Sequence, residues 1–232
     1  MIGIIGAMDE EIFELKKIIK INKEENIFGV IFYQGILNNK DVILVKSKIG
    51  KVASSFVTTL LVNRYKLDYI INIGTCGAIS NKLKYLDIVI GDKLFYHDAD
   101  VRAFGYKYGQ MAQCEPYFET NRLLLEKAKK FDNVFIGDIV SGDEFVDDSH
   151  KMLEKVKQYF NEYNIMACDM ESTAIAHVCT LANVPFIIIR TISDVLDFNG
   201  TKRDFSELAL ESCKILAHFI EEYIGWINIE VL

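Results

Sequence analysis

Carboxylate side chains come directly after three short apolar stretches, and they are the residues of this chain best suited to chemistry. The three segments, in chain order, are Asp9-Glu10-Glu11, Asp169-Met170-Glu171 and Ser193-Asp194. Carboxyl groups that meet in one crevice can divide general acid–base catalysis between them, because one can donate a proton while another accepts one. These segments are therefore the first candidates for a catalytic site.

The apolar stretches that would position these carboxylates are typical of buried strands, because they are short and rich in β-branched residues. We expect strands at Ile2–Ile5, Val42–Val45, Tyr69–Ile73, Ile88–Ile90, Val134–Val140, Ile165–Cys168 and Phe186–Ile192. Helical spacing predicts helices at Glu10–Ile19, Val52–Tyr65, Asn121–Lys130, Lys151–Tyr159, Ser172–Leu181 and about Phe205 to Tyr223. This alternation predicts a mostly parallel sheet covered by helices, with ligands outside the carboxyl ends of the strands.

Composition excludes several classes of protein. The 232 residues are half hydrophobic and carry a net charge of −7 that is spread along the chain, so neither nucleic acid nor a membrane is an expected partner. The five cysteines form no CxxC pair, which argues against a disulfide framework or a zinc ribbon. Without a basic leader, a membrane span or a linker, we expect a single cytoplasmic domain over residues 1–232.

Four segments together resemble the methylthioadenosine/S-adenosylhomocysteine nucleosidases, which belong to the nucleoside phosphorylases and hydrolases. The segments are Gly3–Glu11, Tyr96–Val101, Asp169–Ala176 and Arg190–Asp194, and their order and spacing match from end to end. The resemblance implies a three-layer α/β/α sandwich with a central mixed, mostly parallel β-sheet. It also implies hydrolysis of the N-glycosidic bond of 5'-methylthioadenosine and S-adenosylhomocysteine, a step of methionine salvage, with 5'-deoxyadenosine as a further candidate substrate. No cofactor or metal is implied.

Breaking an adenine–ribose bond needs an acid that protonates the adenine ring and a base that activates water. Asp194 is the candidate acid, because a carboxyl buried after an apolar strand tends to hold its proton. Taken alone, Ser193-Asp194 fits an aspartate that caps the next loop better than it fits an acid, and the resemblance reverses that preference. Ser193 could orient that acid.

Glu11 is the candidate base, since the first turn of a helix favours an ionised carboxylate. The residue types alone do not separate Glu11 from Asp9 or Glu10, because acidic residues commonly begin helices. The resemblance, matched position by position, selects Glu11. It also assigns Glu171 to the ribose hydroxyls and Met170 to the sugar, and it leaves open what Asp169 does, since the family more often has Glu there.

The resemblance assigns the remaining pocket residues. Phe145 is implied to stack on adenine, and the backbone of Val146 to recognise the edge of the base, although such a pair is more often part of a core. Further substrate contacts are expected at Met8, Ile49, Thr75, Arg190 and Phe205. The small residues Thr75-Cys76-Gly77 are expected to form a turn against the ligand, with Cys76 a buried thiol rather than a nucleophile.

The loop from Tyr96 to Tyr106 carries the partner prediction. By resemblance it crosses a two-fold axis, so that Val101, Phe104 and Tyr106 line the site of a second subunit in a homodimer. His97 with Asp98 and Asp100 lacks the ligands of a zinc site. We interpret His177 as a core or surface residue.

The acidic turn at Glu11 argues for water rather than phosphate as the attacking group. A carboxylate about 4 Å from phosphate would oppose it by roughly 4 kcal/mol per phosphate charge at an effective dielectric of 20, and Arg190 is a single arginine, which could equally pair with Glu171 or Glu11. Two alternatives stay open: a phosphate-dependent purine nucleoside phosphorylase, and a nucleoside-binding protein without catalysis. The first would need phosphate for turnover, and the second has little use for an acid and a base.

Overall fold

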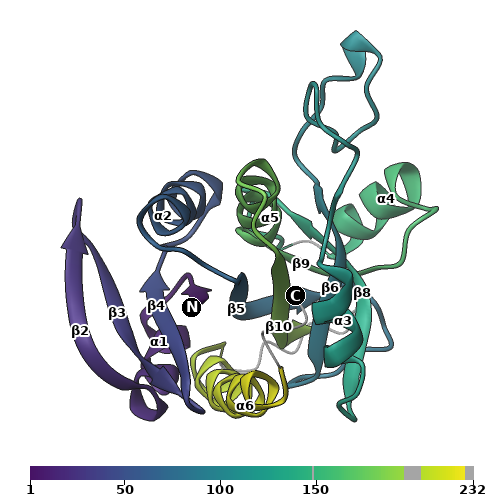
Figure 1. Ribbon diagram of the computed structural model, residues 1–232. Helices are drawn as coiled ribbons and strands as arrows, with labels where there is room; N and C mark the ends of the chain where they lie inside the picture. The colour runs from purple at the N-terminus through teal and green to yellow at the C-terminus, as the bar shows by residue number, and fades with distance from the viewer. Residues whose placement is uncertain (148, 196–204, 228–232) are drawn as a thin grey trace.

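The chain forms a sheet between two layers of helices. The structure is a computed structural model, and it describes residues 1–147, 149–195 and 205–227. Helices α2 (Lys51–Arg64) and α5 (Ser172–Leu181) lie on one face of the sheet, and α1 (Asp9–Ile18) and α6 (Phe205–Trp226) lie on the other (Figure 1). The predicted α/β class and layered sandwich are confirmed.

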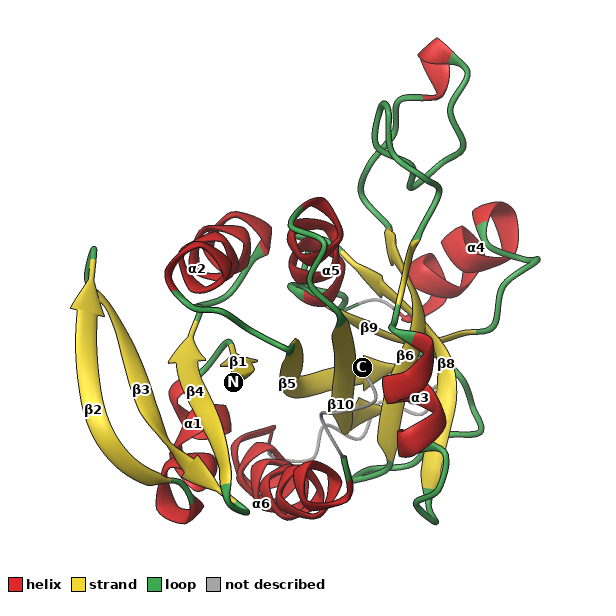
Figure 2. Cartoon of the chain, viewed as in Figure 1, coloured by secondary structure: helices red, strands yellow, loops and turns green. Residues whose placement is uncertain are grey.

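Ten described strands make one mixed sheet (Figure 2). They are β1 (Ile2–Gly6), β2 (Lys20–Ile27), β3 (Val30–Leu37), β4 (Lys40–Lys46), β5 (Tyr69–Ala78), β6 (Ile88–Tyr96), β7 (Phe118–Glu119), β8 (Val134–Ser141), β9 (Ile165–Asp169) and β10 (Phe186–Val195). The remaining helices are α3 (Arg122–Ala128), α4 (Ser149–Tyr159) and the short 3₁₀ turn η1 (Arg102–Phe104).

Strand β5 organises the sheet, because it pairs with three other strands. It lies parallel to β1 and β10, and its last residues pair antiparallel with β9. The strand order runs β10-β6-β8-β9-β5, and the direct β5–β10 pairing closes this part of the sheet on itself. The other half extends through β1, β4, β3 and β2. The ends of several strands thus converge around β5.

Each central strand contributes to two cores, which explains why its sequence is mostly apolar. Side chains alternate between the faces of a strand. In β10, Ile187 and Ile189 belong to the core beneath α1 and α6, whereas Ile188 belongs to the core beneath α2 and α5. Both faces of the central strands are therefore buried, which holds the residues at their ends in fixed positions.

The hairpin strands β2 and β3 were not predicted from the sequence. Strand β2 is an edge strand with mostly exposed polar side chains, so it lacks the apolar pattern of the inner strands. Its turn uses positive φ angles at Phe28 and Gly29, and the turn between β3 and β4 uses them at Asn38 and Asn39. Two successive positive φ angles suit the right-handed twist of a hairpin. The Asn-Asn pair was a signal for the second turn.

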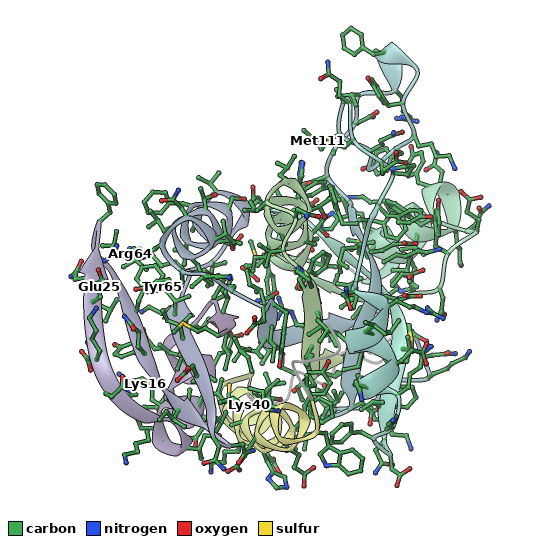
Figure 3. The ribbon with its side chains drawn as sticks, in the orientation of Figure 1. Lys16, Glu25, Lys40, Arg64, Tyr65 and Met111 are labelled. Carbon is green, nitrogen blue, oxygen red and sulfur yellow. The ribbon has the colours of Figure 1, made fainter. Side chains whose placement is uncertain are left out.

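Side-chain hydrogen bonds connect β2 to the end of α2, and β4 to the end of α6 (Figure 3). Glu25 in β2 accepts hydrogen bonds from Arg64 Nη2 at 2.7 Å and from the Tyr65 hydroxyl at 3.0 Å, at the end of α2. Lys40 donates to the carbonyl groups of Ile224 and Ile227 at the carboxyl end of α6. No helix in the described part of the chain is long and apolar enough to cross a membrane.

Candidate active site

A pocket of about 240 Å³ opens where β1, β5, β8, β9 and β10 end. Ten of the residues singled out in the sequence line it, although they come from distant parts of the chain. These are Met8, Glu11, Ile49, Thr75, Phe145, Val146, Met170, Glu171, Ser193 and Asp194. The other lining residues are Ala7, Cys76, Gly77, Glu144, Cys168 and Asp169. The expected crevice with acidic walls is present.

Glu11 is the buried member of the acidic run at the start of α1. Its Oε2 accepts hydrogen bonds from the backbone N–H groups of Ala7 at 2.6 Å and Met8 at 3.1 Å, and Oε1 accepts from Thr75 N at 3.0 Å. Burial raises the pKa of Glu11, although Arg190 and these N–H groups oppose the rise. A carboxylate held by three donors, yet more basic than usual, is suited to take a proton from water.

The neighbours of Glu11 point elsewhere. Asp9 is exposed and binds Lys46, with Lys46 Nζ 2.7 Å from Oδ1, and Glu10 is exposed on α1. Only the third acid of the run therefore enters the pocket. A hydrophobic pattern cannot make this distinction between adjacent acids, because it requires knowing which side of the first helical turn faces β5.

Arg190 in β10 is fully buried beside the acidic pocket. Its Nε donates to Asp169 Oδ2 at 2.7 Å, and Nη2 donates to Asn72 Oδ1 at 2.6 Å. Burial alone would raise the pKa of Asp169. The charge of Arg190 and the hydrogen bonds from Ser141 and Ser172 outweigh burial and hold this pKa below its usual range. Asp169 thus binds Arg190 from the wall of the pocket.

Glu171 occupies the N-cap position of α5, and its Oε1 accepts a hydrogen bond from Gly50 N, outside that helix, at 2.9 Å. Burial and the nearby charge of Asp169 raise the pKa of Glu171 to about 7, although Arg190 and the Gly50 N–H group lower it. Three buried carboxylates, at Glu11, Asp169 and Glu171, thus share one guanidinium. Such a site favours a ligand that brings hydroxyl donors or positive charge.

Ser193 and Asp194 lie within β10, which continues to Val195 instead of ending at Ile192. The register with β5 shifts between Ile192 and Asp194, which pair with Cys76 and Gly77. Ser193 is therefore the extra residue of a bulge, and bulges commonly redirect side chains beside active sites. Asp194 lines the pocket from this bulge.

The prediction of a turn at Thr75-Cys76-Gly77 is wrong, since β5 runs through these residues to Ala78. The strand continues because β10 and β9 both pair with it beyond Gly74. Cys76 is buried, and burial raises the pKa of its thiol well above the usual range. It remains a thiol near neutral pH, as the sequence interpretation expected.

The rim of the pocket is more open than its floor. Phe145 is 63% exposed and Ile49 is 56% exposed, whereas Met8, Val146 and Met170 are half-buried. An exposed aromatic ring beside an acidic floor can cover a flat, apolar ligand. Helix α6 begins at Phe205, but the side chain of Phe205 lies outside the described residues.

Comparison with known proteins identifies the family. The model of the phosphorylase superfamily matches residues 1–224. A 5'-methylthioadenosine/S-adenosylhomocysteine nucleosidase of Staphylococcus aureus (strain JH9) is 42% identical over 220 residues, which cover 93% of this chain and 94% of that protein. The chain belongs to the methylthioadenosine/S-adenosylhomocysteine nucleosidase family.

Solved structures agree with this family membership. The Streptococcus pneumoniae nucleosidase, in complex with the transition-state inhibitor MT-ImmA, is 34% identical with a TM-score of 0.89, covering 98% of this chain and 99% of that chain. A putative nucleosidase of Borrelia burgdorferi B31, bound to adenine, is 34% identical with a TM-score of 0.90 over 98% of this chain and 100% of that chain. The family predicted from the sequence segments is confirmed.

Three residues expected to serve a nucleosidase site lie away from this pocket. Val101, Phe104 and Tyr106 belong to the loop between β6 and β7, which projects from the body (Figure 1) and carries η1 near its tip. Phe104 is 81% exposed, and none of the three lines the pocket of its own chain. A role in substrate binding would therefore require a second subunit.

The two histidines weighed in the sequence lie outside the pocket. His97 is fully buried, and neither ring nitrogen has a hydrogen-bond partner among the described residues. His177 lies on α5, stacks on Phe118 with ring centroids 4.5 Å apart, and contacts the Tyr96 hydroxyl through Nδ1 at 3.1 Å. Neither lines the pocket.

Two residues of the site were not singled out in the sequence. Asn72 binds Arg190, and Gly74 leaves room for it, since a Cβ atom at Gly74 would lie 2.8 Å from Arg190 Nη1 and 2.9 Å from Glu11 Oε1. One signal was available: Asn72 is a polar residue inside the apolar stretch Tyr69–Ile73. A buried amide in such a strand needs polar partners.

Proposed function

We propose that this protein hydrolyses the N-glycosidic bond of 5'-methylthioadenosine and S-adenosylhomocysteine and releases adenine and the thioribose. The observation that carries the proposal is one pocket in which Glu11, Glu171 and Asp194 converge from three segments of the chain. Family membership gives this set its chemical interpretation. 5'-Deoxyadenosine is a further candidate substrate, because it shares the adenine and the ribose.

In this mechanism Asp194 donates a proton to the imidazole-ring nitrogen of adenine as the bond to the sugar breaks. The sugar becomes cationic, and water attacks its anomeric carbon while Glu11 takes the water proton. The pKa of Glu11, raised by burial, makes it a stronger base than an exposed glutamate. Adenine leaves as a neutral base, and the proton on Glu11 returns to solvent or to Asp194 before the next turnover.

The other pocket residues bind the substrate in this proposal. Glu171 accepts hydrogen bonds from the ribose hydroxyls, and this interaction strengthens as the sugar gains positive charge. Met170 packs on the sugar, Phe145 stacks on adenine, and the Val146 backbone binds the edge of the base. The rest of the substrate contacts come from four other residues that line the pocket: Met8, Ile49, Thr75 and Ser193.

The charge of the pocket supports water as the nucleophile. A phosphate dianion would meet Glu11, Asp169 and Glu171, while Arg190 already donates through Nε and Nη2. A phosphorylase needs a cationic or backbone N–H cradle for its phosphate. The acidic floor offers the opposite field, so the phosphorylase alternative fits the site less well.

The test is incubation of the purified protein with 5'-methylthioadenosine in phosphate-free buffer, with and without added phosphate. Chromatography follows adenine and methylthioribose. We expect both products in both samples at the same rate. Release that depends on phosphate would identify a phosphorylase, and an absence of release would favour a binding protein or another nucleoside substrate.

We also propose a cytoplasmic homodimer in which the projecting loop completes the partner's pocket. Exposed Phe104 on this loop, and exposed Phe28, Val52 and Phe56 near the rim residue Ile49, support an apolar contact between subunits. All five cysteines are unpaired, which suits a reducing compartment. Sedimentation should give a dimer mass, and Phe104→Ser should raise KM for 5'-methylthioadenosine. A monomeric, fully active protein would overturn the dimer.

A further inference from the structure

Asn72 is a buried amide that links the sheet to the charged floor of the pocket. It is 1% exposed in the middle of β5, and it does not line the pocket. Its Nδ2 donates to the carbonyl of Ile5 in β1 at 2.9 Å and to that of Ile73 at 3.3 Å. Because only the amide nitrogen can donate to these carbonyls, Oδ1 must face the other way, toward Arg190.

Two residues hold the guanidinium of Arg190 from different strands. Asn72 Oδ1 accepts from Nη2 at 2.6 Å, and Asp169 Oδ2 accepts from Nε at 2.7 Å. With these two contacts the planar group has no remaining freedom to rotate. Its third nitrogen, Nη1, is buried and has no hydrogen-bond partner among the described residues.

The free nitrogen has a defined direction. Nη1 and Glu11 Oε1 both approach the same point above Gly74, where a Cβ atom would lie 2.8 Å from the nitrogen and 2.9 Å from the oxygen. The absence of a side chain at Gly74 therefore leaves a buried donor close to Glu11, which lines the pocket. A water molecule in the pocket beside Glu11 could accept from Nη1 while it donates to Glu11.

We infer that Asn72 is a positioning residue, which aims Arg190 Nη1 at the water that Glu11 activates. This inference rests on the proposed hydrolysis. Asn72 touches neither the substrate nor the water, and it acts by fixing the plane of the guanidinium. Because a displacement of about 1 Å in a reacting group can cost about 100-fold in rate, loss of this contact lowers kcat. KM changes little, because Asn72 does not contact the groups that bind the nucleoside.

Two substitutions separate this role from a structural one. Asn72→Ser keeps a short hydroxyl donor for a neighbouring carbonyl but cannot reach Arg190. Asn72→Asp keeps an acceptor at the right length for Nη2 and loses the two bonds to Ile5 and Ile73. Positioning predicts damage from serine, whereas a purely structural asparagine predicts damage from aspartate. Ile71→Ala, in the core of the same strand, controls for general damage to β5.

We expect Asn72→Ser to lower kcat for 5'-methylthioadenosine by about 10- to 100-fold with KM within about threefold of wild type. Asn72→Asp should lose more thermal stability than Asn72→Ser, because it adds a carboxylate beside Arg190, but it should lose less of kcat. Ile71→Ala should lower the thermal midpoint without changing kcat well below that midpoint. Wild-type kcat in Asn72→Ser, or equal losses in Asn72→Ser and Asn72→Asp, would overturn the inference.

Crystal structures of the wild type and of Asn72→Ser add a result that does not depend on the substrate. The inference predicts that the guanidinium turns and that Nη1 moves away from Gly74 and Glu11. An unmoved guanidinium would overturn the inference even if the wild type proved inactive toward 5'-methylthioadenosine. That inactivity, by contrast, would overturn the proposed function alone.

Discussion

Two glutamates that face arginines in this molecule differ in their proton affinity. Glu25 lies on the surface hairpin, and the hydrogen bond from Arg64, followed by that from Tyr65, lowers its pKa (Figure 3). Glu11 lies in the pocket floor with Arg190 as its charged neighbour, and burial raises its pKa in spite of that charge. The same pair of residue types therefore gives an acid in water and a base in the interior.

The difference shows how the fold makes a reactive site from ordinary residues. Around Arg190, three buried carboxylates compete for one positive charge, whereas Arg64 on the surface has one glutamate that solvent also stabilises. An excess of buried negative charge costs stability in the empty protein. It becomes favourable when the sugar turns cationic, so the site binds the transition state better than the ground state.

The largest effect should come from neutralising the buried glutamate but not the exposed one. We expect Glu11→Gln to lower kcat for 5'-methylthioadenosine by about 10² to 10⁴, because the base is lost. Asp194→Asn should cost a similar factor through loss of the acid. Glu25→Gln is the matched control and should leave kcat unchanged. Steady-state adenine release measures all three, and circular dichroism confirms folding.

These variants also test the roles separately. Full activity in Glu11→Gln would remove Glu11 as the base, and full activity in Asp194→Asn would remove Asp194 as the acid. A loss in Glu25→Gln equal to that in Glu11→Gln would mean that the comparison between the two glutamates does not bear on catalysis.

The next effect concerns stability and the two arginines. Arg190→Met should lower the free energy of unfolding by about 3 to 5 kcal/mol, because it leaves buried carboxylates without their cation. Arg64→Met removes an exposed partner of Glu25 and should change the denaturation midpoint little. Urea unfolding at neutral pH measures both. Equal losses in the two variants would contradict the distinction between a buried and an exposed pair.

The sequence predicted the parts of the molecule that have one strong pattern. Strands β5 and β10 begin with apolar runs that Asn72 and Arg190 interrupt, and the predicted helix Ser172–Leu181 is the observed α5. Strand β2 was missed because its charged side chains face solvent, where no hydrophobic pattern forms. The long β5 was cut short at Ile73, because its last residues owe their strand conformation to β9 and β10 and not to local propensity.

Only those parts of the site that short sequence segments specify could be predicted. Acids after strands indicated a crevice, yet the choice of Glu11 over Asp9 and Glu10 needed the family resemblance. Asn72 was overlooked because its partners, Ile5 and Arg190, are 67 and 118 residues away in the chain. Contacts of that separation depend on which strands become neighbours, and this information is absent from local spacing.

A smaller effect should appear in the pH dependence of stability, through Glu171. Its pKa is about 7 in the folded protein against an ordinary 4.5, so the folded state keeps a proton that the unfolded state releases between these pH values. The stability that protonated Glu171 contributes to the folded state is fully present below pH 4.5 and is lost as the pH rises through 7. The shift corresponds to about 3 kcal/mol. Glu171→Gln should therefore gain about that much relative to wild type between pH 4.5 and pH 8.

Unfolding free energies of wild type and Glu171→Gln at several pH values between 4.5 and 8 check this prediction. Parallel profiles would show that Glu171 does not hold a proton in the folded state. Glu25→Gln again serves as the surface control, and because the pKa of Glu25 is lowered, any contribution from it fades in the opposite direction, as pH falls.

The smallest effect should come from salt, which screens charges that solvent can reach. The Debye length falls from about 10 Å at 0.1 M ionic strength to about 3 Å at 1 M, and buried pairs are screened much less. Any midpoint difference between wild type and Arg64→Met should therefore shrink as salt is raised, whereas the difference for Arg190→Met should persist. Thermal unfolding at low and high sodium chloride measures this. If the Arg190→Met difference also disappeared in salt, solvent would have to reach Arg190, and the raised pKa of Glu11 could not be due to burial.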